Sequence, residues 1–291
     1  MPVSSPDIQS DIQDPLPMPF YFDGWNRRQL PHAQALWDFH QALTCPTVLL
    51  SLPSAVPSGS PSGAFFDEES DRIMVGKLLR VVPETVTKQA LAACEAEKLP
   101  RALLAEQVSA ARVWAGPARF PDDRAVNGFM DQWVCPHARL LAHLAGISGS
   151  WQRSYVDELA QGFFWTGRLM ALKRDVSEGR FFIPETDLAQ HGVSHEQLLE
   201  GRVDESMKRL LWKQTIRAKN AFALAEPLAL ELPRRKAGAF KRWWLGALEV
   251  LHEIRRREYD VWARPVVLSG RSRMQVRIQA RFGRTTFRSR G

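Results

Sequence analysis

Apolar residues recur at spacings of three and four along most of this chain, which is the period of an α-helix. The clearest run follows Asp204, a residue type that often caps a helix N-terminus, and continues to Leu232. A period of two, typical of strands, occurs only in the segment MQVRIQARF near the C-terminus, where neighbouring arginines argue against a buried strand. The pattern predicts an all-α protein of roughly ten helices in one domain, without a cofactor-binding sheet. The predicted helices occupy Pro31–Leu43, Lys88–Lys98, Arg101–Trp114, Pro121–Val134, Pro136–Ala145, Trp151–Asp175, Asp204–Leu232 and Gly238–Tyr259.

Stretches rich in proline, serine and glycine divide the chain. Residues 1–19 are rich in Pro, Ser and Asp and are predicted to be a loose leader. The segment SLPSAVPSGSPSG, residues 51–63, cannot continue a helix and is predicted to be a flexible loop inside a helical domain over residues 20–270. Residues 271–291 form a basic C-terminal tail.

Composition narrows the class of protein. Hydrophobic residues make up 45% of the 291 residues and charged residues 24%, which excludes wholesale disorder and disulfide scaffolds. The three cysteines, Cys45, Cys94 and Cys135, are odd in number and widely spaced, which favours a reducing compartment. The first residues lack the basic start of a signal peptide, and no apolar run is long enough to span a bilayer. We therefore expect a cytoplasmic protein.

The formal net charge of +7 is located in the tail. Residues 271–291 contain seven arginines and no acid, so the other 270 residues are formally neutral. This distribution argues against a nucleic-acid-binding protein, which needs basic residues on a folded face. It predicts peripheral contact of the tail with the anionic cytoplasmic face of the inner membrane, with Phe282 and Phe287 at the headgroup level. A solubilising tail and nonspecific RNA binding are the alternatives.

The most informative segment is LAQGFFWTGRLMALKRDVSEGRFFIP, residues 159–184. Asp175 and Glu178 are three residues apart and share one helix face if the helix continues that far. Two carboxylates on one face can hold Mg²⁺ against a phosphate, because this cation prefers oxygen ligands. A solvated helix end with two acids is the alternative interpretation.

This segment resembles the second half of the squalene/phytoene synthases, the head-to-head prenyltransferases. Gly179, Arg180, Phe182 and Pro184 match the family's G-R-x-Y-x-P motif, with Phe in place of Tyr. Further matches follow in the family's order over roughly residues 88–270: upstream Leu99–Pro100, Arg119–Phe120 and Pro136 with Arg139, and downstream DLAQHGV at residues 187–193, Gln214 with Arg217 and Ala218, Leu232–Pro233, and Tyr259–Trp262.

The resemblance implies an isoprenoid-synthase-like helical bundle around a central cavity. It implies Mg²⁺-dependent condensation of prenyl diphosphates, such as farnesyl diphosphate, in squalene, hopanoid or carotenoid synthesis; NADPH use stays open. On this basis Asp175 and Glu178 are the candidate catalytic acids, and Arg174 and Arg180 the candidate diphosphate ligands. The candidate metal ligands are Asp67, Glu68, Asp71 and Asp175, and the candidate walls of the prenyl-chain cavity are Phe163, Phe164, Trp165 and Leu169.

The acid motifs depart from the family's pattern. Counted back from Gly179 without a gap, the second acid of D-x-x-x-D falls on Asp175 but the first falls on Ala171. A gapped alternative matches Arg174–Asp175 to the family's RD and brings Glu178 near the second acid. Where the first acid motif should follow the helix LWDFHQAL, Thr44, Cys45 and Pro46 stand instead, and FFDEESD at residues 65–71 is either a displaced copy or a charged helix start. The chain therefore either uses a rearranged acid set or is a non-catalytic homologue that binds a lipid or assists complex assembly.

Overall fold

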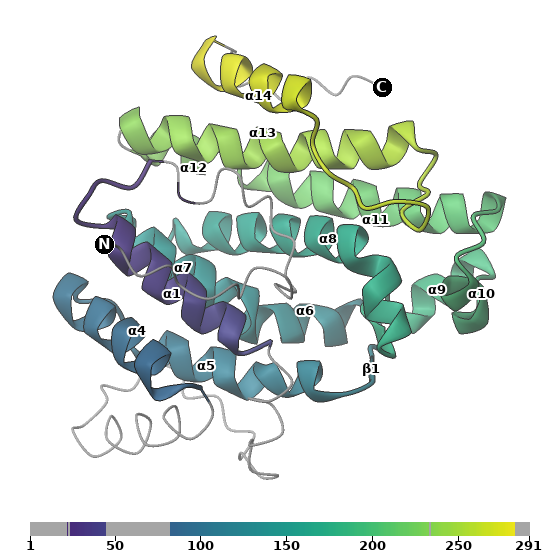
Figure 1. The fold of residues 1–291 in the computed structure, drawn as a ribbon, viewed down its shortest axis with the longest axis horizontal. Helices are drawn as coiled ribbons and strands as arrows, with labels where there is room; N and C mark the ends of the chain where they lie inside the picture. Colours follow the sequence, from purple (N-terminus) through teal and green to yellow (C-terminus); the bar gives the residue numbers. More distant parts are fainter. Residues whose placement is uncertain (1–21, 23, 45–81, 233, 283–291) are drawn as a thin grey trace, which may run out of the picture.

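The computed structural model describes residues 22, 24–44, 82–232 and 234–282. The predicted leader, the 51–63 loop and the acids Asp67, Glu68 and Asp71 lie outside these residues. The described part is an all-α bundle, which confirms the predicted fold class (Figure 1). Its helices are α1 (Leu30–Ala42), α4 (Glu84–Glu97), α5 (Ala102–Ala110), the 3-10 helix η2 (Ala111–Ala115), α6 (Asp123–Gln132), α7 (Val134–Leu144), α8 (Arg153–Ser177), α9 (Glu185–His191), α10 (His195–Glu200), α11 (Glu205–Leu224), α12 (Leu228–Glu231), α13 (Arg234–Arg256) and α14 (Gly270–Phe282).

Helix α8 has 25 residues and packs against α7, α11 and α13. Gly162 lets α11 approach closely, because a Cβ added there would lie 2.8 Å from the ring of Phe222. The chain leaves the helix through Gly179, whose φ of +74° is a left-handed conformation that favours glycine. Helix α8 therefore runs through the bundle with one end held in a tight turn.

A minimal sheet fixes that turn. Strand β1 (Ala118–Arg119) pairs in parallel with β2 (Arg180–Phe181), with Ala118 opposite Arg180. The pairing places the C-terminal end of α8 beside η2, from which Trp114 projects into the core. Segments more than sixty residues apart in the sequence thus meet at one end of α8.

Side-chain caps begin several of the helices. Asp204 accepts a hydrogen bond from the backbone N–H of Met207 at the start of α11, which confirms its predicted role as N-cap. Asp122 does the same for Ala125 at α6, and Ser194 for Gln197 at α10. Of these three capped helices, α6 and α11 were predicted from the sequence and α10 was not.

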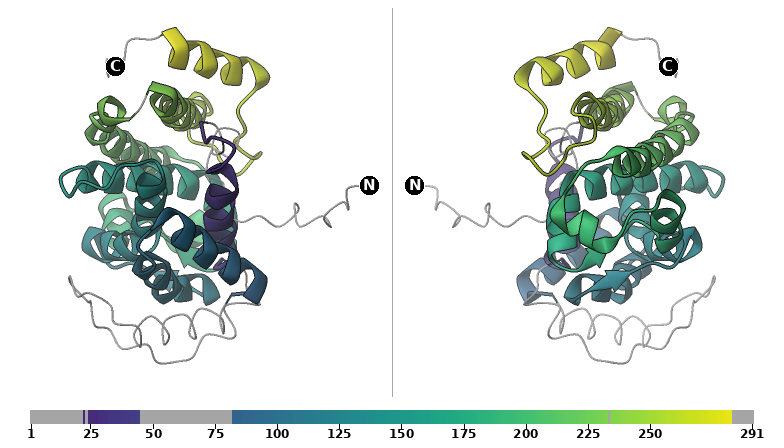
Figure 2. Two further views of the ribbon diagram at one scale, coloured as in Figure 1. Left: turned by 90° about the vertical axis from the view of Figure 1, so that its left-hand side faces the viewer. Right: turned by 90° about the vertical axis from the view of Figure 1, so that its right-hand side faces the viewer.

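The segment MQVRIQARF, whose alternation is typical of a strand, is helical. It belongs to α14, which lies as an outer layer on α13 (Figures 1 and 2). Ser269 accepts a hydrogen bond from the N–H of Ser272 at the start of this helix, and Ser272, Val276 and Ala280 are buried. The first part of the predicted tail is therefore a packed helix, and residues 283–291 lie outside the described part. No helix among the described residues is long and apolar enough to cross a membrane.

Candidate active site

The N-terminal half of α8 lines an apolar cavity of about 130 Å³. Val156, Leu159, Ala160, Phe163 and Phe164 form its α8 wall. Helix α7 supplies Val134, Ala138, Leu141 and Ala142, and α13 supplies Ala239, Phe240 and Trp243. Such a lining suits a long hydrocarbon chain.

Few polar groups line this cavity. His40 and His137 stack with ring centroids 4.3 Å apart, and Nδ1 of His40 lies 2.8 Å from Oε1 of Gln107. Burial, and to a smaller extent the neighbouring His40, hold the pKa of His137 well below its ordinary value. The His137 ring is therefore neutral at pH 7. Lys236 lies at the Trp25 side of the cavity, with Nζ 5.6 Å from the centre of the Trp25 ring.

The C-terminal half of α8 carries a buried ion pair. Asp175 is 1% exposed, and its Oδ2 accepts a hydrogen bond of 3.0 Å from Nη1 of Arg168, two helical turns earlier. Nη2 of Arg174 lies 3.6 Å from the other carboxylate oxygen. The guanidinium of Arg168 also lies over the rings of Trp114, Phe182 and Phe164, at 4.8, 5.3 and 5.7 Å from their centres. Cation–π contacts and the carboxylate together hold this buried charge.

Arg180 adds a further buried cation beside this pair. Its guanidinium forms an ion pair with Glu178 and donates a 3.4 Å hydrogen bond to the backbone carbonyl of Trp114. Burial lowers the pKa of Arg180, Asp175 opposes that shift, and Arg168 and Arg174 add to it. Asp175 and Glu178 are thus surrounded by arginines, which makes this end of α8 cationic.

An aromatic cluster connects the cavity to the arginines. Trp133 contacts His40 at the cavity, with ring centroids 4.3 Å apart, and also Trp114, at 5.5 Å. Phe164 lines the cavity and contacts Phe182, with ring centroids 5.6 Å apart. One α8 residue, Phe164, therefore touches both the cavity and the ring cluster on which Arg168 lies.

The four predicted cavity walls fall into two groups. Phe163 and Phe164 line the apolar cavity. Trp165 and Leu169 instead line a small pocket that also contains Arg168, Asp175, Arg180 and Gln214. The two groups line different pockets because residues 163 and 165 lie about 200° apart around the helix.

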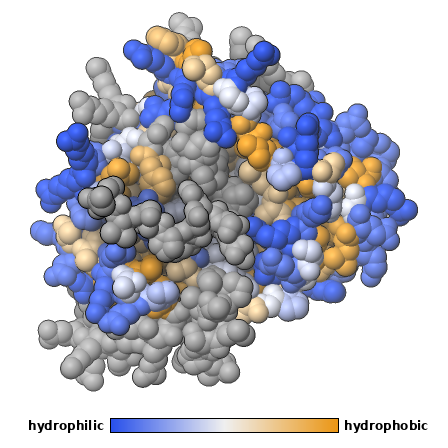
Figure 3. Space-filling model, viewed as in Figure 1, coloured by the Kyte–Doolittle hydropathy of each residue, from blue (hydrophilic) through white to orange (hydrophobic). Residues whose placement is uncertain are grey.

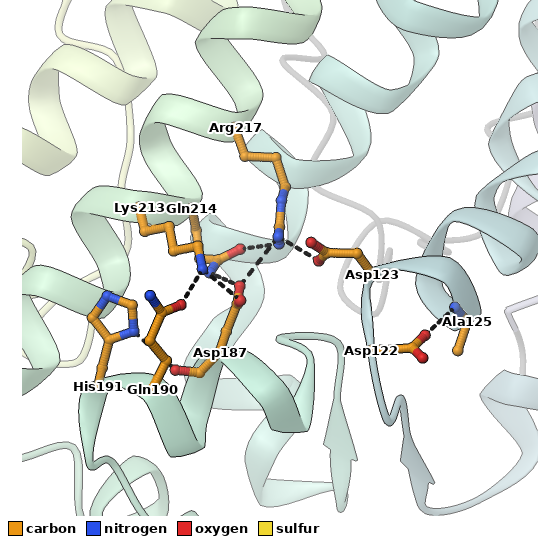
Figure 4. Close-up of polar contacts among 9 residues, drawn as sticks. All are labelled: Asp122, Asp123, Ala125, Asp187, Gln190, His191, Lys213, Gln214 and Arg217. Atoms are coloured by element: carbon orange, nitrogen blue, oxygen red, sulfur yellow. Dashed lines mark hydrogen bonds and ion pairs between the residues drawn. The ribbon is translucent and has the colours of Figure 1, made fainter.

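A second polar cluster, none of whose members is among the candidate site residues, adjoins this small pocket (Figure 4). Asp187, on α9, accepts hydrogen bonds of 2.8 Å from Nζ of Lys213 and from Nε2 of Gln214. Nη2 of Arg217 lies 3.2 Å from Oδ2 of Asp187 and also pairs with Asp123 on α6. Burial would raise the pKa of Asp187, but the hydrogen bonds and the nearby cations outweigh burial and lower it. The cluster thus joins α6, α9 and α11 around one ionised carboxylate.

A sequence signal for this cluster exists. Lys213 and Arg217 are four residues apart on α11 and so share a face, and Gln214 and Arg217 were among the residues that resemble the family. Their partner Asp187 begins the DLAQHGV segment. Arg217 also lies over the ring of Trp165, 4.7 Å from its centre, so the cluster contacts the wall of the small pocket.

The described residues do not fit a magnesium site. No group of three His, Cys, Asp or Glu side chains that could hold a metal occurs among residues 22–44 and 82–282 as far as they are described. The candidate acids found there are held by arginines: Asp175 by Arg168 and Arg174, and Glu178 by Arg180. The remaining candidate ligands, Asp67, Glu68 and Asp71, lie outside the described part, so the predicted metal set is not brought together within it.

The fold is that of an isoprenoid synthase. The crystal structure of a dehydrosqualene synthase in complex with ligand matches with a TM-score of 0.71 and 14% identity, over 90% of this chain and 89% of that chain. Squalene synthase HpnC from Alicyclobacillus acidocaldarius matches with a TM-score of 0.65 and 18% identity, over 81% of this chain and 87% of that chain. At these identities the likeness establishes the fold alone.

The chain belongs to the squalene/phytoene synthase family, because the model of that family matches residues 64–275. The phytoene synthase of Arthrospira platensis is 33% identical over 129 residues, which are 40% of this chain and 40% of that protein. The chloroplastic phytoene synthase of Cucumis melo is 33% identical over 105 residues, 33% of this chain and 24% of that protein. The matched parts span well under two thirds of the length of these relatives. The family model confirms the resemblance inferred from the motifs.

Proposed function

We propose that this protein is a prenyltransferase that condenses prenyl diphosphates, such as farnesyl diphosphate, in squalene, hopanoid or carotenoid synthesis. The observation that carries the proposal is the arrangement along α8. The first half of α8 lines an apolar cavity, and buried arginines surround its second half. Phe164 lines the cavity and also contacts Arg168. A prenyl diphosphate has the same division, because an apolar chain ends in a multiply charged group.

The arrangement suits ionisation of an allylic diphosphate. In that step the bond between carbon and the diphosphate oxygen breaks, and its electron pair leaves with the pyrophosphate. Under this proposal Arg174 and Arg180, which lie beside Asp175 and Glu178, stabilise the charge that develops on the leaving group. The apolar cavity keeps water from the carbocation left behind. Arg168, held by Asp175 and three aromatic rings, positions the cationic site.

The resemblance implies Mg²⁺, and a Mg²⁺ requirement stays a prediction. Asp175 and Glu178, the candidate acids among the described residues, are engaged by arginines. Titration of activity with Mg²⁺ and with a chelator tests the requirement directly.

The proposal is tested by incubating the purified protein with farnesyl diphosphate and Mg²⁺ and measuring pyrophosphate release. We expect release in the wild type and a fall in kcat/KM of about tenfold to hundredfold in Arg174→Gln, because one cation at the leaving group is lost. Arg209→Gln, at an exposed arginine on α11, is the matched control and should behave like the wild type. Equal activity of Arg174→Gln and the wild type would show that Arg174 does not stabilise the leaving group.

A non-catalytic lipid-binding homologue is the second candidate. The engagement of Asp175 by Arg168 favours it, because that carboxylate is already neutralised by a buried cation. This candidate predicts saturable binding of farnesol or farnesyl diphosphate in the cavity without pyrophosphate release. Binding without release over a range of prenyl chain lengths would decide for this candidate.

The expected location follows from the proposed chemistry. Substrates and products with long apolar chains partition into membranes, so we infer a cytoplasmic enzyme that works at the inner membrane. Fractionation of cells at low and high salt tests this location, since a peripheral protein leaves the membrane fraction at high salt.

A further inference from the structure

Helix α14 has two opposite faces. Ser272, Val276 and Ala280 are four residues apart and are buried against α13. Met274, Ile278 and Phe282 are also four apart and follow the opposite side of the helix. Their exposed fractions are 55%, 53% and 76%, so α14 presents a continuous apolar stripe to the outside.

The charges of α14 are all of one sign. The helix carries Arg271, Arg273, Arg277 and Arg281 and no acidic residue. Successive residues turn by about 100°, which places Arg271 and Arg281 within the exposed stripe and Arg277 at its edge. Arg281 lies over the ring of Phe282, 5.4 Å from its centre. In Figure 3 apolar and strongly polar atoms adjoin at the top of the molecule, where α14 lies in Figure 1.

We propose that the outer face of α14 is a docking surface for an anionic membrane, in which Met274, Ile278 and Phe282 enter the headgroup region and the arginines contact lipid phosphates. An exposed apolar stripe with basic flanks on a helix lying flat on a protein is the arrangement that binds a lipid interface. Charge complementarity selects anionic lipid, because four arginines without an acid attract a negatively charged surface. The surface differs from the tail predicted from composition, since it is a packed helix that ends at Phe282.

The docked helix has a defined relation to the apolar cavity. Helix α13, on which α14 packs, supplies Lys236, Phe240 and Trp243 to the cavity wall. Ser272 on α14 donates a 3.1 Å hydrogen bond to Glu249 of α13, which joins the two helices. One helix therefore separates the proposed membrane surface from the cavity, which is a short path for a membrane-soluble product.

The test uses the full chain and needs no substrate, so its outcome is independent of the proposed enzyme activity. Sedimentation is measured with vesicles of phosphatidylcholine alone and of phosphatidylcholine mixed with phosphatidylglycerol, at low and high salt. We expect binding to the anionic vesicles only, weakened by salt. The double variant Arg271→Gln/Arg281→Gln should bind about thirtyfold more weakly, since each basic residue near the surface contributes about fivefold. The triple variant Met274→Gln/Ile278→Gln/Phe282→Gln should bind at least about tenfold more weakly.

The matched control is Leu199→Gln on α10, a leucine that is 54% exposed elsewhere on the molecule and should leave binding unchanged. Hydrogen exchange of residues 270–282 should slow when anionic vesicles are added, which a folding defect in a variant does not imitate. Wild-type protein that stays in the supernatant with anionic vesicles overturns the proposal. So does a chain ending at Phe282 that loses all binding while the α14 variants keep it, because the contact then belongs to residues 283–291.

Discussion

The two halves of α8 differ in what surrounds them. The first half is lined by apolar side chains and faces a cavity, whereas the second half packs a buried aspartate and arginines against aromatic rings. Side chains that line a cavity can gain volume toward the cavity without displacing a packed neighbour. A buried ion pair tolerates little, because each charge depends on the other. The same helix therefore has one half suited to accept a ligand and one half in which the charges are held in place.

The largest expected effect is the loss of Arg168. In Arg168→Met the buried Asp175 loses its 3.0 Å partner, and we expect the free energy of unfolding to fall by about 3–5 kcal/mol in urea denaturation. The double variant Arg168→Met/Asp175→Leu should recover most of this loss, because the buried carboxylate that lost its partner is then removed as well. Arg174→Met, at a side chain that is 32% exposed, is the control and should cost about 1 kcal/mol or less. Equal stability of the wild type and Arg168→Met would contradict the division of α8.

Gly162→Ala tests the close packing of α8 against α11. The added Cβ would lie 2.8 Å from the buried ring of Phe222, so this ring or the helices must shift, and we expect a loss of about 1–3 kcal/mol. Gly128→Ala on α6 has nothing within 4 Å of the added Cβ and should be neutral or stabilising by up to about 1 kcal/mol. Thermal unfolding measures the loss of stability in both variants. A loss of similar size in both would contradict the explanation by contact with Phe222.

Asp187 extends the charged half to α9 and α11 and makes stability depend on pH. Its pKa is lower in the folded protein, so its stabilisation is present above the ordinary aspartate pKa of about 3.9 and is lost as the pH falls through the folded value. We expect Asp187→Asn to lower the free energy of unfolding by about 1–2 kcal/mol at neutral pH, with a smaller difference at about pH 3. Urea midpoints across this range measure the effect, with Glu200→Gln, at an exposed position on α10, as control. A difference that is constant with pH would show that the ionised carboxylate is not the cause.

The smallest effect on stability is expected in the cavity. Ala160 lines it, and Ala160→Leu adds volume toward the open space, so we expect a change in stability below about 1 kcal/mol. The same change should weaken binding of farnesol, measured by displacement of a fluorescent fatty-acid probe, by about tenfold. Ala189→Leu at an exposed position on α9 is the control. Unchanged farnesol affinity in Ala160→Leu would place the prenyl chain elsewhere.

The local pattern was sufficient to predict most of the helices. Apolar spacing and the cap at Asp204 are properties of a few neighbouring residues, and they predicted the long helices α8, α11 and α13. The order of the motifs around Gly179–Arg180 indicated the family, which the family model confirms. The roles assigned to Asp175, Glu178 and the displaced acids stay predictions, because no metal ligand set is assembled among the described residues.

Other properties depended on contacts between distant segments. Asp175 and Arg168 are two turns apart on one helix, but Trp114 and Phe182, which hold the arginine, come from η2 and the chain after β2. The helical form of α14 depended on α13, which buries Val276 and Ala280 and so favours a helix over the alternation that the segment shows by itself. The sequence determined where helices form, because that depends on neighbours along the chain. The tertiary structure decided which charges pair and which aromatic rings border the cavity, because burial and ion pairing depend on segments that meet only in the folded bundle.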